Sequence, residues 1–151
     1  MLEVYIDADG CPVKEEVYRV ARRHALHVHV VSNSILRVPN GEWVHQVLVS
    51  HEFDAVDDWI VERIGAGDIA ITGDVRLAAR CLAKGARAIG LKGQAHTEES
   101  IGGTLATRDL MDGLRQMGAV TGGPAPMSPR DRSRFLSRLE EAVQAIRRHG
   151  R

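Results

Sequence analysis

Short apolar segments alternate with helical patterns over residues 1–96, and this alternation restricts the fold more than any other feature. The segment DIAIT at 68–72 is the clearest strand, because such a short apolar strand is typical of a parallel sheet covered by helices on both faces. Further strands are predicted at 2–6 (LEVYI), 27–32 (HVHVVS), within 43–50 (WVHQVLVS) and at 87–91 (RAIGL). The order of these elements predicts an α/β fold with a mainly parallel sheet.

Helical spacing of apolar side chains fills the intervals between the strands. The first helix is expected to start at Pro12, because proline suits the first helical position. Two more helices are marked by Val56, Ile60 and Ile64, and by Leu77, Ala78, Cys81 and Leu82.

Beyond residue 91 no further strand is expected. Apolar spacing predicts helices at 110–117 and from Ser128-Pro129 to 146, separated by a Gly/Pro-rich segment at 118–129. We therefore predict one domain over 1–151, with an α/β core at 1–96 and a helical C-terminal extension at 97–151.

Composition excludes several classes of protein. Twenty basic residues balance twenty acidic ones, and aromatic residues make up 4% of the chain, which argues against a strongly basic or base-stacking nucleic-acid surface. No run approaches the roughly 18 apolar residues that a membrane span needs. Met1 leads directly into the first strand, and the two cysteines are isolated, so we expect a reduced, cytoplasmic protein with no membrane partner.

Acidic residues follow three of the predicted strands. Asp7 and Asp9 come after the first strand, Asp57 and Asp58 open the helix after the third, and Asp74 follows the strand at 68–72. Loops at the carboxyl ends of parallel strands form the binding crevice of an open sheet, so these acids are expected at one edge. Asp68 starts its strand, roughly 16 Å from the Asp74 loop at the usual rise of a strand, and is expected at the opposite edge, bonded to local backbone.

A cluster of carboxylates needs a compensating charge. Two negative charges about 5 Å apart repel by roughly 3 kcal/mol at an effective dielectric constant near 20. Oxygen ligands without histidine or cysteine favour Mg²⁺ or Mn²⁺, which activate water and neutralise phosphodiester charge. The acids also have structural interpretations, with Asp9 as the cap of the first helix and Asp54, Asp57 and Asp58 at the positive end of theirs.

Several motifs resemble one bacterial family. DADGCPVK, NSILRVP, DDWI, GDIAITGDVRLAARCLAKGA, TRDLMDGLR, GGP and DRSRF occur here in the order found in the YaiI/YqxD family, over roughly residues 2–146. That family is usually placed with PIN-like domains, three-layer folds in which helices flank a parallel sheet. Small departures at Gly10, Gly73 and Arg76 remove no carboxylate.

The resemblance implies a metal-dependent nuclease. Acids of PIN-like nucleases bind Mg²⁺ or Mn²⁺ and cleave RNA. On this chain the resemblance implies Asp7, Asp57 and Asp74 as catalytic residues and metal ligands, Asp58 as a less secure ligand, and Asp9 as an auxiliary ligand. RNA is then the expected partner, and a second copy of the chain or a regulatory protein is a further candidate.

Three other residues are candidates for contact with substrate. Lys14 in the first helix could reach a phosphate, Asn33 ends the second strand on the acidic edge, and Thr72 could orient Asp74 through its hydroxyl group. Each also has a structural interpretation, respectively a solvated lysine, an Asx turn and a β-forming residue at a strand end.

Two other functions stay open at this point. IDADGC resembles the strand-end motif of haloacid-dehalogenase phosphatases, with Asp7 as nucleophile and Asp9 as acid/base, although Cys11 replaces the usual Thr and Ala78 stands where a second acid is usual. The third function is a non-catalytic RNA-binding or regulatory module that keeps the acids for folding.

Overall fold

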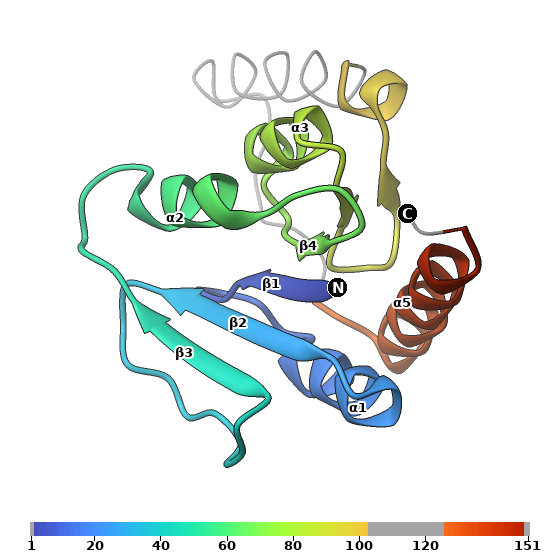
Figure 1. Cartoon of the computed structure of the whole chain (residues 1–151), viewed down its shortest axis with the longest axis horizontal. Helices are drawn as coiled ribbons and strands as arrows, with labels where there is room; N and C mark the ends of the chain where they lie inside the picture. The colour runs from blue at the N-terminus through green and yellow to red at the C-terminus, as the bar shows by residue number, and fades with distance from the viewer. Residues whose placement is uncertain (1, 103–125, 150–151) are drawn as a thin grey trace.

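The computed structural model describes residues 2–102 and 126–149, drawn in colour in Figure 1. Its sheet has the strand order β3-β2-β1-β4-β5-β6. The strands are β1 (Glu3–Asp7), β2 (His27–Ser32), β3 (Val44–Leu48), β4 (Ile69–Ile71), β5 (Arg87–Ile89) and β6 (Ala95–His96). All neighbours from β3 to β5 pair in parallel, which confirms the predicted α/β class and the mainly parallel sheet.

The expectation that strands end after residue 91 was wrong. β6 pairs antiparallel with β5, through Ala88 with His96 and Ile89 with Ala95. A strand of two residues is too short to show alternation in the sequence, so no pattern could predict it. A tight turn joins the two strands, and Gly93 in this turn has a φ of 89°. A Cβ atom there would lie 3.1 Å from the α5 backbone at Phe135 Cα, so the close approach requires glycine.

The helices are α1 (Lys14–His24), α2 (Ala55–Arg63), α3 (Val75–Ala83) and α5 (Pro129–His149). Residues 98–102 are also helical. The start of α5 at Pro129 is as predicted, and Ser128 and Asp131 exchange hydrogen bonds of 3.1 Å as a reciprocal cap. The predicted helix at 110–117 and most of the Gly/Pro-rich segment lie outside the described residues.

The first helix begins later than predicted. α1 starts at Lys14 rather than at Pro12, and no side chain caps it at Val13. The chain first makes a tight turn, closed by the hydrogen bond from Cys11 N to Ala8 O, in which Gly10 adopts a φ of 75°. The turn consumes the residues that the sequence pattern assigned to the first helical turn.

Helices cover both faces of the sheet, which gives three layers (Figure 1). On one face, α1 and α5 bury Val4 and Ile6 of β1 under Phe135, Leu139 and Val143. On the other face, α2 and α3 bury Tyr5, Val31 and Ala70 under Ile60, Ile64, Leu77 and Cys81. Within the described residues, no helix has the length and apolar character needed to cross a membrane.

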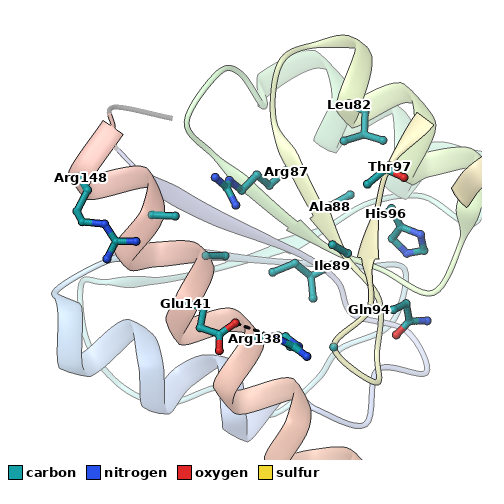
Figure 2. A pocket seen from close by; sticks show the side chains of 14 residues that line it. Leu82, Arg87, Ala88, Ile89, Gln94, His96, Thr97, Arg138, Glu141 and Arg148 are labelled. Atoms are coloured by element: carbon teal, nitrogen blue, oxygen red, sulfur yellow. Dashed lines mark hydrogen bonds and ion pairs between the residues drawn. The ribbon is translucent and has the colours of Figure 1, made fainter. Parts of the chain in front are cut away.

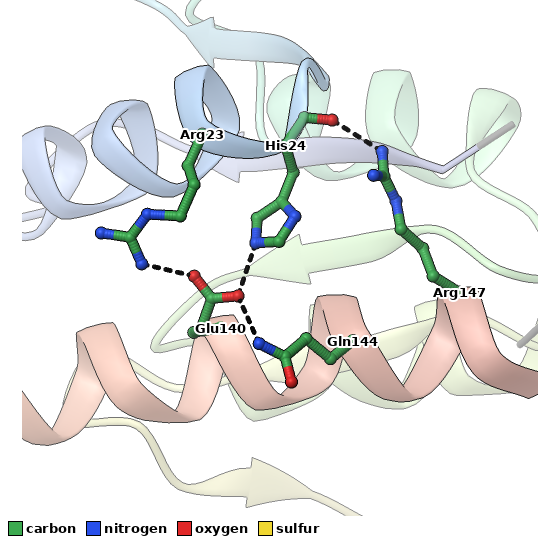
Figure 3. Close-up of polar contacts among 5 residues, drawn as sticks. All are labelled: Arg23, His24, Glu140, Gln144 and Arg147. Atoms are coloured by element: carbon green, nitrogen blue, oxygen red, sulfur yellow. Dashed lines mark hydrogen bonds and ion pairs between the residues drawn. The ribbon is translucent and has the colours of Figure 1, made fainter.

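Polar contacts fix α5 against α1 (Figure 3). The Glu140 carboxylate accepts from Arg23 at 2.7 Å and also contacts the His24 ring, while Gln144 donates to it at 3.0 Å. Arg147 donates to the backbone carbonyl of His24 at 2.7 Å. The C-terminal helix is therefore part of the same packed unit as the strands of the predicted core.

Candidate functional site

Four of the five predicted acids meet in one crevice at the carboxyl edge of the sheet. The crevice has a volume of about 350 Å³, and its lining includes Asp7, Asp9, Asp57 and Asp74. These residues come from the ends of β1 and β4 and from the first turn of α2. Loops after parallel strands share an edge, and for this reason residues far apart in the sequence line one cavity.

Thr72 links two of the acids through a single oxygen atom. Its hydroxyl group donates a 2.8 Å hydrogen bond to Asp7 Oδ2 and accepts one of 2.9 Å from the backbone N–H of Asp74. Thr72 is fully buried, directly after β4. The predicted orienting role of this hydroxyl group matches the geometry, and Asp7 is held by the same group. Substrate contact by Thr72 stays a prediction.

Burial and neighbouring negative charges raise the pKa of two carboxylates of the crevice, Asp7 and Asp57. Burial raises the pKa of Asp7, the hydrogen bond from Thr72 lowers it, and the charges of Asp74 and Asp9 raise it further. Burial together with the charges of Asp7, Asp74 and Asp54 raises the pKa of Asp57 to about 6, although Arg80 pulls in the opposite direction. The crevice is therefore a place where bound positive charge, either a proton or a metal ion, relieves repulsion.

Asp9 does not cap the first helix, contrary to its structural interpretation from the sequence. Its Oδ2 accepts a 2.8 Å hydrogen bond from the backbone N–H of Asn33, and its Oδ1 accepts one of 2.9 Å from the Ser34 hydroxyl group. The turn before α1 carries Asp9 toward the end of β2 instead. Asn33 lines the crevice and also anchors Asp9 through its backbone.

Asp58 and Lys14 do not line the crevice. The Asp58 carboxylate forms a 2.9 Å ion pair with Arg80 on α3, and its side chain is 54% exposed. The Lys14 ammonium group donates to the carbonyl oxygens of Cys11 at 2.7 Å and Ala8 at 3.4 Å, which braces the turn before α1. Of the two neighbouring acids that open α2, only Asp57 belongs to the crevice.

Asp68 lies at the opposite edge of the sheet, as predicted. It is 8% exposed, and its two carboxylate oxygens accept hydrogen bonds of 3.0 Å from the backbone N–H groups of Glu3 and Gly65. One of these bonds is local and the other reaches the start of β1. Asp68 therefore ties β4 to β1 and is remote from Asp74 despite its proximity in the sequence.

Sequence reasoning missed one wall of the crevice. His51, Glu52, Phe53 and Asp54 also line it, in the irregular loop between β3 and α2. This loop shows no hydrophobic period, so nothing in the pattern placed these four side chains at the edge. The apolar Phe53 in a polar loop was the only available signal.

Histidines cluster on the face of the sheet that α2 partly covers. The His29 ring stacks on Tyr5 at 4.5 Å and on His45 at 5.0 Å, and His27 Nδ1 lies 2.8 Å from His45 Nε2. His29 also contacts Glu3 at 2.7 Å.

In residues 2–102 and 126–149 no three His, Cys, Asp or Glu side chains are placed to hold a metal ion directly.

A larger cavity of about 860 Å³ separates α5 from β5 and β6 (Figure 2). Arg87, Arg138 and Arg148 line it together with apolar side chains such as Ile89 and Ala142. None of the crevice acids contributes to this lining. Its volume exceeds that of the acidic crevice, but it lacks the set of interacting carboxylates, so the crevice is the better candidate for catalysis.

Fold and crevice together define an α/β protein with an acidic pocket at the carboxyl edge of a parallel sheet. A family model described as "Uncharacterized BCR, YaiI/YqxD family" matches residues 5–145, and the chain belongs to this family. A UPF0178 protein of Rhodospirillum rubrum is 60% identical over 148 residues, covering 97% of this chain and 99% of the relative. A UPF0178 protein of Azorhizobium caulinodans is 55% identical over 149 residues, covering 99% and 94%. No solved structure matches the chain.

Replacing Thr72 with valine should loosen the crevice without changing its volume much. Asp7 would lose its hydrogen-bond donor, and the backbone N–H of Asp74 would lose its acceptor. Because Thr72 is buried, this should cost about 1–3 kcal/mol of stability. If the crevice holds Mn²⁺, loss of this hydrogen bond to Asp7 should also weaken Mn²⁺ binding by about 10- to 100-fold. Urea denaturation and Mn²⁺ titration of the melting temperature measure both effects. Thr72→Ser keeps the hydroxyl group and should retain most of the binding, and equal binding by Thr72→Val would contradict the orienting role.

Proposed function

We propose that this protein is a Mg²⁺- or Mn²⁺-dependent nuclease that hydrolyses phosphodiester bonds of RNA, as the PIN-like resemblance implies. The observation that carries the proposal is the crevice that Asp7, Asp57 and Asp74 line together, in which burial and neighbouring negative charges raise the pKa of Asp7 and of Asp57. Such carboxylates attract a hard divalent cation more strongly than isolated ones do. When bound, the ion would activate water for attack and neutralise charge on the phosphodiester.

The donor set fits a hydrated ion. Mg²⁺ in phosphoryl-transfer sites usually keeps several waters and takes only one or two carboxylates from the protein. Asp7 is the best placed of these, because it lines the crevice and the Thr72 hydroxyl group fixes its carboxylate through Oδ2. Asp74 and Asp57 line the same space. Water-mediated contacts from these two would complete the site, so three direct protein ligands would not be needed.

Asp9 and Asp58 have weaker support as ligands. Both oxygens of Asp9 already accept hydrogen bonds from the loop after β2, so it supports the shape of the crevice. Asp58 is paired with Arg80, whose positive charge also opposes the rise in the pKa of Asp57. We therefore assign the metal to Asp7, Asp57 and Asp74.

The phosphatase alternative has less support from the geometry. A haloacid-dehalogenase mechanism needs the second Asp of the motif free to exchange a proton with the leaving group, whereas both Asp9 oxygens accept hydrogen bonds. It also needs a lysine near the nucleophile, and none of the described crevice-lining residues is a lysine. Lys84 donates to the Val61 carbonyl at 3.0 Å, and Lys92 lies 3.9 Å from Asp131.

A matched pair of variants, Asp57→Asn and Asp58→Asn, tests the proposed site. Wild type and Asp58→Asn should cleave RNA with Mn²⁺ and gain thermal stability from the ion, because binding to the native state alone stabilises it. Asp57→Asn should lose most of both effects. RNA cleavage by gel electrophoresis and melting curves with and without Mn²⁺ measure them. An equal Mn²⁺ response of the two variants would contradict the assignment of Asp57.

The pH dependence of this pair follows from the raised pKa of Asp57. The native state holds the Asp57 proton more tightly than the unfolded state, so the resulting stability is present below about pH 4 and is lost as the pH rises through about 6. Without metal, the stability of wild type relative to Asp57→Asn should therefore fall across this window. Mn²⁺ should reverse that fall. Wild type that responds to Mn²⁺ but cleaves no RNA would favour the non-catalytic module.

A further inference from the structure

Three large apolar side chains are exposed at the carboxyl edge of the sheet, and one of them lines the acidic crevice. In the described part of the chain, the large hydrophobic residues that are exposed are Phe53 at 93%, Ile35 at 83% and Leu48 at 57%. Leu48 ends β3, Ile35 lies in the loop after β2, and Phe53 lies in the loop after β3. All three positions belong to the carboxyl edge of the sheet. Of these three residues only Phe53 lines the acidic crevice, so it is the one placed to meet a ligand bound there.

Phe53 differs from every other aromatic residue of the chain. The chain has two Phe, two Tyr and two Trp residues. Tyr5, Tyr18 and Phe135 are buried, and Trp43 and Trp59 pack against the two hydrophobic clusters. Phe53 alone is exposed, and it lines the same crevice as the carboxylates.

The loop that carries Phe53 is held in place by its own hydrogen bonds. Ser50 Oγ accepts from the backbone N–H of Glu52 at 3.3 Å, and the Glu52 carbonyl accepts from Ala55 N at 3.1 Å. The next residue after Phe53 is Asp54, a non-glycine residue with a φ of 64° at the start of α2. Backbone in this uncommon region occurs often at functional sites. The aromatic ring is thus presented on a defined turn next to the acids.

The charge of the crevice also limits how a nucleic acid could bind. Its described lining contains the aspartates of the acid cluster and neighbouring loop residues, but no lysine or arginine. Ion pairs with this described lining cannot supply affinity for a phosphate backbone, which leaves the metal and contacts to the bases as sources of affinity within the crevice. An exposed aromatic ring supplies such a contact for any base whose face is accessible.

We propose that Phe53 stacks on an unpaired nucleobase next to the cleaved phosphate. This inference rests on the proposed nuclease function. In a duplex each base is already stacked between its neighbours, and a ring at the crevice could not reach its face. The same ring could accept any of the four bases, because every base has a π-face, so we expect little sequence preference from Phe53.

The test uses a short single-stranded RNA that contains 2-aminopurine, whose fluorescence falls when an aromatic ring stacks on it. Phe53→Ala in the full chain with Mg²⁺ should weaken binding by about 5- to 100-fold and abolish the stacking-induced quenching. Phe53→Trp should restore binding. Ile35→Ala removes an equally exposed apolar side chain that does not line the crevice, and it should bind as wild type does. Neither change should alter the Mg²⁺-induced shift in melting temperature.

The outcomes separate this inference from the proposed function. Cleavage of single-stranded RNA with unchanged KM in Phe53→Ala would overturn the stacking role and leave the nuclease in place. Quenching that depends on Phe53 without any cleavage would support the stacking role and overturn the nuclease. Equal cleavage of duplex RNA, or a changed oligomeric state of Phe53→Ala with unchanged RNA affinity, would overturn the inference.

Discussion

Replacing Asp7 with asparagine should reduce RNA cleavage with Mn²⁺ by at least about 100-fold, since even residues that only support a metal ligand are worth about 10- to 100-fold. The asparagine side chain would keep one acceptor oxygen for the Thr72 hydroxyl group, so the local structure should persist. The loss of the negative charge should weaken metal binding and relieve the repulsion that Asp7 experiences from Asp74 and Asp9. We therefore expect a metal-free melting temperature equal to or above that of wild type. Initial cleavage rates and differential scanning fluorimetry measure the two effects.

Asp68→Asn is the matched control for Asp7→Asn. Asp68 is also a partly buried aspartate, but it accepts two backbone N–H bonds at the opposite edge. Asparagine can accept only one of them well, at a cost of about 1–3 kcal/mol of stability. Cleavage by Asp68→Asn should persist at temperatures where the variant is folded. An equal loss of cleavage in the two folded variants would show that the acidic crevice is not the site.

Phe135→Ala should destabilise the protein by about 3–5 kcal/mol, the usual cost of removing a buried aromatic ring. Phe135 is fully buried on α5, it packs into the cluster that contains Val4 and Ile6 of β1, and Gly93 approaches its backbone closely. Urea denaturation measures the change. Ser133→Ala on the exposed side of the same helix should change stability little. If Phe135→Ala lost no more stability than Ser133→Ala, α5 would have to fold separately from the sheet.

The acidic edge was predictable because it depends on topology rather than on side-chain detail. Once the strands are parallel, Asp7 and Asp74 must share an edge and Asp68 must lie at the other. The sequence could not separate Asp57 from Asp58, because both open α2 and only the position of Arg80 decides which one turns away. The raised pKa of Asp7 and of Asp57 likewise depends on burial, which the sequence pattern does not specify.

Irregular segments account for the failures of sequence-based prediction. Asp9 was interpreted as a helix cap because it precedes α1, but the turn at Gly10 carries it to the loop after β2. The same turn delays α1 to Lys14. Phe53 stands in a loop without a hydrophobic period, and its exposure became visible only once the fold was known. Local hydrogen bonds and backbone conformations decide these places, and they leave no periodic signal.

The position of α5 bears on how the chain reaches its native state during synthesis. β1 precedes all other strands in the sequence but lies inside the sheet, between β2 and β4. A growing chain can pair β1 with β2 and cover part of one face with α1, but Phe135, Leu139 and Val143 emerge from the ribosome long afterwards. Until then the part of this face that α5 will cover stays open, and apolar side chains of β1 remain accessible to other chains. α5, which is made after all the strands of the sheet, thus covers one face of the first strand, and nascent chains that lack α5 expose the apolar side chains of that face.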